Sequence, residues 1–198
     1  MDKVFHCLGA SNHSDRERAQ ADLYTSDPKA VQALLEAFPL NQYVFEPCAG
    51  LGHISELIKK TGRDVITSDI NDYGYKLDFQ RDFFQVKRGD VTAPTPFDIV
   101  TNPPYKGALD FVKHAIELLE DGGRVIMLLR IQFLEGIERG QFFKEHPPRF
   151  VYVFTRRVLC LLNGEPQKHN SAACFAWFIW EKDFKGDPVV RWLLNDEE

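Results

Sequence analysis

Short apolar runs alternate with helix-patterned segments along most of this chain, and this alternation constrains the fold more than any other feature. The runs typical of buried strands are 43–45, 64–68, 97–101 and 124–129. The segments with apolar residues at helical spacing are 28–38, 53–60, 108–119 and 133–146. Strands that alternate with helices form βαβ units, in which the strands lie parallel. The sequence therefore predicts an α/β fold with a mostly parallel sheet.

The C-terminal part departs from this alternation. Two strand-like runs, 150–161 and 172–180, are joined only by the polar loop 163–171. A short connection of this kind cannot hold a crossover helix, so we expect the two runs to be antiparallel neighbours.

The length of 198 residues suits one domain with a substantial core. The first residues are polar and aperiodic, which predicts a flexible arm over 1–21. We interpret 22–198 as a single domain, with a cofactor half over about 22–95 and a catalytic half over about 96–182.

Composition excludes several classes of protein. No apolar run approaches the roughly 20 residues of a membrane-spanning helix, and the N-terminus lacks a secretory signal, so we expect a cytoplasmic location and no membrane partner. The 4 cysteines and 6 histidines show no metal-ligand spacing, which predicts no metal site.

The charge of the chain is unevenly distributed. The net charge of −5 argues against a uniformly basic protein that coats nucleic acid. The segment 139–169 nevertheless carries +4, which leaves −9 for the rest. This segment is either an ordinary solvated face or a local surface for a phosphate backbone.

A glycine-rich turn after 43–45 is the first candidate for ligand binding. Gly50 and Gly52 allow the backbone to approach a ligand at the start of a helix. The full Gly-x-Gly-x-x-Gly spacing is missing, because position 55 is Ser. Asp69, 17 residues beyond Gly52, follows the next strand, where nucleotide-binding α/β domains hold the ribose hydroxyls.

Glu46, four residues before Gly50, discriminates between two kinds of cofactor. Its charge would repel a phosphate and attract the ammonium of an amino-acid moiety. It therefore favours S-adenosylmethionine over NAD, unless it serves only as a capping carboxylate for the following helix.

The run 97–101 ends in Asn102-Pro103-Pro104-Tyr105, the candidate catalytic segment. Side chains at the carboxyl end of a parallel strand face the ligand crevice. The prolines stiffen the backbone and leave only carbonyl acceptors. The Asn102 side-chain oxygen and the Pro103 carbonyl would accept both hydrogens of an amino group, and Tyr105 would stack on its ring. This arrangement predicts methylation of an exocyclic amino nitrogen by positioning, without a general base.

These motifs resemble those of a known family. Glu46-Pro-Cys-Ala-Gly-Leu-Gly, Asp69 and Asn102-Pro-Pro-Tyr are similar to motifs I, II and IV of class I amino-methyltransferases, in the order of γ-type DNA adenine-N6 enzymes. The segment 24–31 resembles their N-terminal motif X, and the chain resembles small phage and prophage forms over about 22–182. The resemblance implies a Rossmann-like domain with a seven-stranded, mostly parallel sheet, an antiparallel C-terminal strand and helices on both faces.

The resemblance also implies S-adenosylmethionine as the cofactor, with Ser26, or as the less favoured alternative Thr25, at its methionine carboxylate. The implied cofactor-binding residues are Tyr24, Ser26, Glu46, Pro47, Gly50, Gly52, Asp69, Ile70, Asp82, Phe83 and Asn102. The motif III Asp, which contacts the cofactor adenine, has two candidates. Asp82-Phe83 is favoured because the ring could stack on adenine, and Asp90-Val91 is the rival.

Several substrates share the Asn-Pro-Pro-Tyr segment. Adenine in DNA is favoured, and adenine or guanine in RNA is the alternative. A protein glutamine amide is less favoured, because that family usually has an N-terminal helical domain and an Asp-Leu-Gly motif that this chain lacks. Intact Asn102 and Glu46 disfavour a non-catalytic binding module.

Duplex DNA would require base flipping, with Tyr105 and either Phe142, Phe143 or the loop 163–171 holding the base. The target sequence and the oligomeric state stay open.

Overall fold

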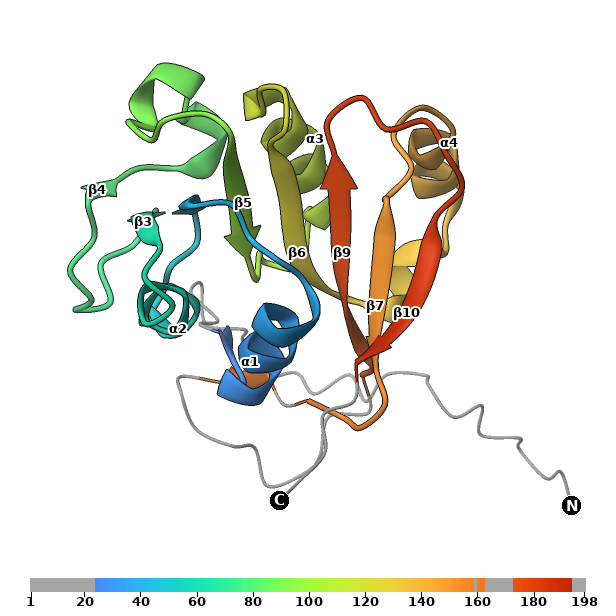
Figure 1. Cartoon of the computed structure of the whole chain (residues 1–198), viewed down its shortest axis with the longest axis horizontal. Coiled ribbons are helices and arrows are strands. Elements are labelled where there is room, and N and C mark those ends of the chain that lie inside the picture. Colours follow the sequence, from blue (N-terminus) through green and yellow to red (C-terminus); the bar gives the residue numbers. More distant parts are fainter. Residues whose placement is uncertain (1–23, 159, 163–172, 194–198) are drawn as a thin grey trace, which may run out of the picture.

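The computed structural model describes residues 24–158, 160–162 and 173–193 (Figure 1). The expected arm over 1–21 and the loop 163–171 lie outside these residues. Within the described ranges, no helix is long and apolar enough to cross a membrane.

The described residues form an eight-stranded sheet in the order β10-β7-β9-β6-β5-β2-β3-β4. Its strands are β2 (Tyr43–Glu46), β3 (Asp64–Asp69), β4 (Phe79–Gln80), β5 (Phe97–Thr101), β6 (Arg124–Arg130), β7 (Phe150–Phe154), β9 (Phe175–Glu181) and β10 (Val189–Leu193). β9 is antiparallel to both of its neighbours, and every other pair is parallel. The predicted mostly parallel sheet with an antiparallel strand near the C-terminus is confirmed, with one strand more than expected.

The run 150–161 is not one strand, as predicted, but two. β7 ends at Phe154, and the polar stretch from Thr155 to Arg157 follows outside any strand. β8 (Cys160–Leu162) then pairs antiparallel with β1 (Tyr24–Ser26) in a separate two-stranded sheet. The polar stretch interrupts the apolar pattern, which is the physical reason for the break.

β10 is an edge strand that no sequence pattern indicated. It pairs in parallel with β7 along its whole length. Val189, Val190 and Trp192 have high strand propensity, but they are exposed, and only Leu193 is buried. A strand buried at one residue shows no apolar alternation.

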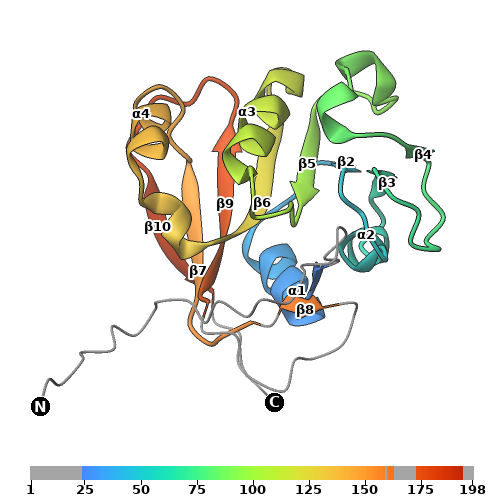
Figure 2. The same cartoon turned by 180° about the vertical axis from the view of Figure 1, so that it is seen from behind.

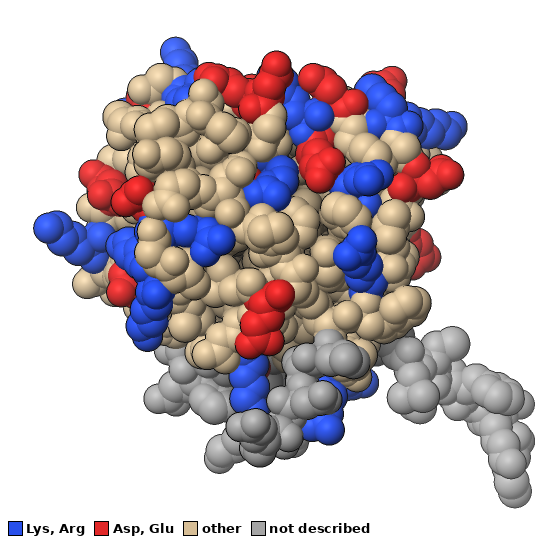
Figure 3. Space-filling model, viewed as in Figure 1, with Lys and Arg blue, Asp and Glu red and all other residues tan. Residues whose placement is uncertain are grey.

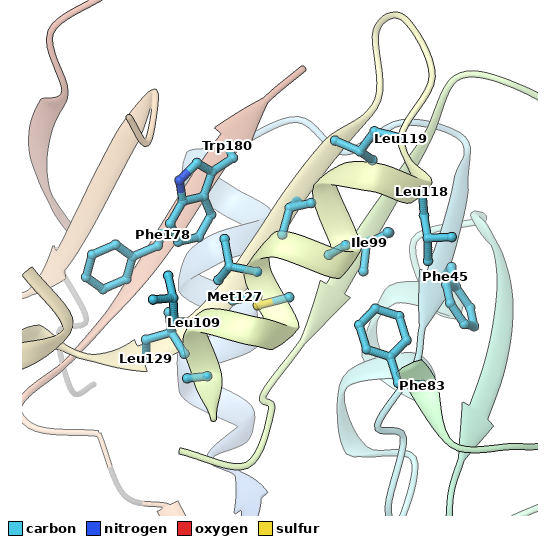
Figure 4. Close-up of a cluster of buried hydrophobic side chains, with 14 of the residues drawn as sticks. Phe45, Phe83, Ile99, Leu109, Leu118, Leu119, Met127, Leu129, Phe178 and Trp180 are labelled. Carbon is cyan, nitrogen blue, oxygen red and sulfur yellow. The ribbon is translucent and has the colours of Figure 1, made fainter. Parts of the chain in front are cut away.

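Helices cover both faces of the large sheet (Figures 1 and 2), as predicted. α1 (Pro28–Ala37) and α2 (His53–Lys59) share a buried cluster with one face, and α3 (Ala108–Leu118) shares a second cluster with the other. α4 (Ile137–Glu145) packs two phenylalanines against the second cluster. Figure 4 shows α3 over Ile99 and Met127 of the central strands.

A buried ion pair lies at the edge of the sheet where β5 and β6 begin. The carboxylate of Asp98 accepts four N–H groups: the Asn41 backbone at 2.7 Å and side chain at 2.9 Å, and Arg124 Nε at 2.8 Å and Nη2 at 2.7 Å. Asp98 is fully buried. The cluster joins β5, β6 and the segment before β2, at the opposite edge of the sheet from Asn102.

Candidate active site

Three neighbouring parallel strands bring the predicted site residues to one edge of the sheet. β2 lies between β3 and β5, and these strands end at Glu46, Asp69 and Thr101, the residue before Asn102. Glu46, Asp69 and Asn102 are all buried. The chain order reverses between β2 and β5, and open α/β sheets bind ligands at the carboxyl ends of strands at such a switch point.

The glycine turn is tied to Asp69. The backbone N–H of Gly50 donates to Asp69 Oδ2 at 2.9 Å, and Asn71 N–H donates to Oδ1 at 3.0 Å. Burial raises the pKa of Asp69, although these backbone hydrogen bonds partly counteract it. Each carboxylate oxygen keeps acceptor capacity for a further donor, because ionised Asp offers about four lone-pair sites.

Gly52 is required for two reasons. Its φ is +77°, and a Cβ at this position would clash with the ring of Tyr75. The Tyr75 hydroxyl donates to Glu56 Oε1 at 2.6 Å and accepts from Lys59 Nζ at 3.0 Å. The loop between β3 and β4 thus covers the glycine turn, and no sequence pattern indicated this contact.

Three carboxylates surround the glycine turn. Burial, together with the charges of Asp69, Glu46 and Asp82, raises the pKa of the Cys48 thiol far above its usual range. A turn with this surrounding is unfavourable for a phosphate and favourable for a cation or a hydroxyl-rich ligand. The thiol itself stays protonated and unreactive.

Glu46 is paired with the residue that replaces the third glycine of the dinucleotide-binding pattern. The Ser55 hydroxyl donates to Glu46 Oε2 in the buried interior. Burial, the largest effect, raises the pKa of Glu46 from 4.5 to about 8. At neutral pH the carboxyl of the ligand-free protein is therefore mostly protonated.

The raised pKa of Glu46 predicts a pH-dependent stability difference for Glu46→Gln. The folded-state pKa of about 8 lies above the ordinary value of 4.5, so the contribution of Glu46 to stability is complete below pH 4.5 and is lost as pH rises through 8. Gln stays neutral and can still accept from Ser55. We expect the variant to be more stable than the native protein by up to about 4 kcal/mol at pH 8, because ionisation of the native carboxyl favours the unfolded state between pH 4.5 and pH 8. Urea unfolding at several pH values measures this, and a difference that does not shrink toward pH 5 would contradict it.

Asn102 follows β5 directly, as predicted. Pro103 is buried beside it, Pro104 is exposed, and Tyr105 is half-buried. The ring centroid of Tyr105 lies 5.6 Å from that of Phe175 and 4.9 Å from the guanidinium carbon of Arg130. Arg130 was not among the predicted residues, because a single Arg after an apolar run carries no motif.

Ser26 lies close to α2, the helix that follows the glycine turn. It ends β1, which contacts α2. Ser26 is 2% exposed, and its Oγ has no hydrogen-bond partner within the described ranges. A buried hydroxyl in this situation is suited to a polar ligand. The backbone of Tyr24 pairs with Leu162, and its side chain lies outside the described structure.

The two motif III candidates differ in surroundings. Asp82 is near Cys48 of the turn and caps the short helix η1 (Phe83–Gln85) through Phe84 N–H at 3.0 Å. Asp90 is engaged in a 2.6 Å ion pair with Arg81 and in a hydrogen bond from Lys87 N–H. We therefore favour Asp82 over Asp90 as the motif III residue.

Phe83 does not lie where the predicted stacking on the cofactor adenine needs it. It is 3% exposed and stacks on Phe111 of α3 at 5.4 Å, close to Phe45 (Figure 4). The Asp-aromatic pattern does not determine the face toward which the ring points. Ile70, directly after Asp69, is 57% exposed and offers an apolar surface beside that carboxylate instead. Pro47, another of the predicted residues, is buried in the glycine turn.

The basic residues of the segment 139–169 that the structure describes do not form one surface. Arg149 precedes β7 and Arg156 follows it, so they lie at opposite ends of that strand. Figure 3 shows Lys and Arg dispersed among Asp and Glu over one face of the molecule.

Across the described residues, no group of three or more His, Cys, Asp or Glu is placed to hold a metal ion.

No protein-family model matches the chain, and no curated protein sequence matches it. Solved structures do match. A protein from Agrobacterium tumefaciens described as a predicted O-methyltransferase is 14% identical, covering 85% of this chain and 86% of that chain with a TM-score of 0.58. The M protein of the type I restriction enzyme EcoKI is 14% identical, covering 82% of this chain and 45% of that chain with a TM-score of 0.54.

The 23S rRNA methyltransferase ErmE is 15% identical, covering 83% of this chain and 73% of that chain with a TM-score of 0.54. These three proteins are described with different substrates or none, and identities this low show the fold alone. The chain therefore has the α/β fold of the class I S-adenosylmethionine-dependent methyltransferases.

Proposed function

We propose that this chain binds S-adenosylmethionine and transfers its methyl group to the exocyclic N6 amino group of adenine in DNA. The observation that carries the proposal is the position of Asn102. It is buried at the carboxyl end of β5, beside the strand ends that carry Glu46 and Asp69. A stiff Asn-Pro-Pro segment thus borders an acidic edge at the switch point of the sheet.

The residues near the glycine turn fit a cofactor with an ammonium, a carboxylate and a ribose. Asp69 would accept from the ribose hydroxyls. Glu46, which is mostly protonated in the ligand-free protein, would release its proton and accept from the ammonium when the cofactor binds, because a nearby cation favours the ionised carboxyl. Ser26 would donate its buried hydroxyl, which has no partner in the described part of the chain, to the carboxylate. The acidic surroundings disfavour the phosphates of NAD. The bound cofactor supplies an electrophilic methyl group on a sulfonium.

The adenine end of the cofactor would lie toward β4. Exposed Ile70 offers an apolar surface for the ring, and Asp82 an acceptor for its amino group. Because Phe83 is part of the core, this role in stacking falls to Ile70 in our proposal.

Asn102 and Pro103 would hold the target amino group. Their side-chain and backbone oxygens accept its two hydrogens, which draws the nitrogen lone pair out of conjugation with the ring. Tyr105 stacks on the base that carries the amino group. The proton can leave after transfer, so the rate depends on positioning and fixed dipoles rather than on a general base.

DNA is the proposed substrate because the order of the motifs resembles that of the γ-type DNA adenine enzymes. RNA is the second candidate, since the 23S rRNA methyltransferase ErmE has a similar fold.

The proposal is tested by incubating the protein and methyl-labelled S-adenosylmethionine with duplex DNA, single-stranded DNA and RNA side by side. We expect label in DNA. Label in RNA alone would overturn the choice of DNA, and label in none of the three would overturn the proposed function.

A binding experiment tests the cofactor site separately. We expect Asp69→Ala to raise the Kd for S-adenosylmethionine by about 10-fold or more, because a charged hydrogen-bond acceptor is lost. Asp64→Ala is the matched control, since Asp64 begins the same strand at the opposite edge of the sheet. Equal Kd values for the two variants in calorimetry would exclude Asp69 from the site.

A further inference from the structure

Arg130 lies beside the candidate catalytic segment and is held there by the sheet. It is the last residue of β6, next to β5, and it pairs in register with Phe175 of β9. The following backbone N–H, of Ile131, donates to the carbonyl of Cys174 at 2.9 Å. The guanidinium carbon lies 4.9 Å from the ring centroid of Tyr105, in the range of a cation–π contact.

Most described arginines pair with an oxygen, but Arg130 does not. The pairs are Arg63 with the Leu40 carbonyl, Arg81 with Asp90, Arg88 with Glu120, Arg124 with Asp98, Arg139 with the Glu135 carbonyl, and Arg149 with Glu181. Within the described ranges, the guanidinium of Arg130 lies over the ring of Tyr105, and the side chain has neither a hydrogen bond nor an ion pair. Its side chain is exposed, so its five N–H donors face solvent.

A guanidinium can stack and donate at the same time. Its flat face contacts an aromatic ring, while its N–H groups point outward in its own plane and match a phosphate. Lys106, directly after Tyr105, is also exposed and adds positive charge at this edge. Arg130 is thus equipped to contact the ring and an anion together.

We propose that Arg130 is a positioning residue of the substrate site, which holds the Tyr105 ring with its flat face and binds a backbone phosphate of the nucleic acid with its edge. This inference rests on the proposed function, because it takes nucleic acid as the substrate. Phosphate binding would fix the guanidinium, and the guanidinium would fix the ring that stacks on the base. Binding of the nucleic-acid backbone and positioning of the target base are then coupled through one side chain.

The phosphate contact is tested by equilibrium binding of a short fluorescein-labelled DNA duplex at several salt concentrations. Each phosphate contact contributes close to 1 to the slope of log K against log salt, so Arg130→Ala should reduce the slope by about 1. Arg130→Lys keeps the charge and should keep the slope. The control is Arg191→Ala. Arg191 lies on the outermost strand β10, with its guanidinium carbon 5.0 Å from the centroid of the Phe150 ring, so this change removes the same charge and a similar ring contact. It should leave the salt slope unchanged.

The ring contact is tested by kcat. Lys cannot stack as a plane, so Arg130→Lys should lower kcat by roughly 5-fold although it binds DNA with the native slope. In a Tyr105→Leu background, Arg130→Lys should lower kcat no further, because the ring that it positions is gone.

Equal salt slopes for the native protein and Arg130→Ala, or a native kcat in Arg130→Lys, would overturn this inference, as would a native protein that binds no DNA. The binding readout requires no methyl transfer. A protein that binds DNA with an Arg130-dependent slope but transfers no methyl group would refute the proposed function while supporting the phosphate contact.

Discussion

Asn102→Ala should lower the rate of methyl transfer by roughly 10³-fold while it leaves the affinity for S-adenosylmethionine nearly unchanged. Asn102 is buried at the carboxyl end of β5, and its proposed role is to accept a hydrogen from the target amino group. Removing the amide removes that acceptor and leaves Glu46 and Asp69, the proposed cofactor contacts, in place. Single-turnover methyl transfer and calorimetric cofactor binding measure the two effects.

Asn102→Asp is the matched variant, because it keeps the shape and the accepting oxygen. It should retain more activity than Asn102→Ala, which distinguishes an acceptor from a side chain that only fills space. An equal loss of cofactor affinity and turnover in Asn102→Ala would contradict the assigned role.

The second large effect concerns stability. Asp98→Ala should lower the free energy of unfolding by about 3–5 kcal/mol, because it leaves the mostly buried Arg124 guanidinium without its carboxylate. The Asn41 backbone N–H would also lose its acceptor, whereas the Asn41 side chain would keep its hydrogen bond to the Gly122 carbonyl at 3.1 Å. Urea unfolding measures the loss.

Asp121→Ala is the control for this experiment. Asp121 also pairs with a cation, Lys182 at 3.5 Å, but its side chain is 98% exposed, so the change should cost less than about 1 kcal/mol. Replacing both Asp98 and Arg124 by apolar residues should recover part of the loss but not all of it, because the Asn41 backbone N–H stays without its acceptor. Similar losses in Asp98→Ala and Asp121→Ala would show that the buried cluster does not stabilise the fold.

The central strands could be predicted from the sequence because they are buried on both faces. β5 is buried at every residue, and β6 at all but its two ends, so each appears as a continuous apolar run. β10 and β8 could not be predicted in this way. β10 is buried only at Leu193, and β8 pairs with β1 across a long stretch of chain, a contact that no local pattern encodes.

The candidate site also has features that could be predicted from the sequence and features that could not. Glu46, Asp69 and Asn102 could be placed together from sequence, because the ends of neighbouring parallel strands meet at one edge of the sheet. The orientation of a ring outside a regular strand could not, and Phe83 points into the core. The contacts of Tyr75 with Gly52 and of Arg130 with Tyr105 depend on tertiary packing and carry no sequence signal.

The central claim, that this chain methylates the N6 amino group of adenine, is tested most directly by identifying the methylated nucleoside. DNA labelled by the native protein is digested to nucleosides, which are separated and assayed for label. We predict that the label is in N6-methyldeoxyadenosine and is absent when Asn102→Ala replaces the native protein. Label in a cytosine or guanine nucleoside, or equal labelling by Asn102→Ala, would contradict the account.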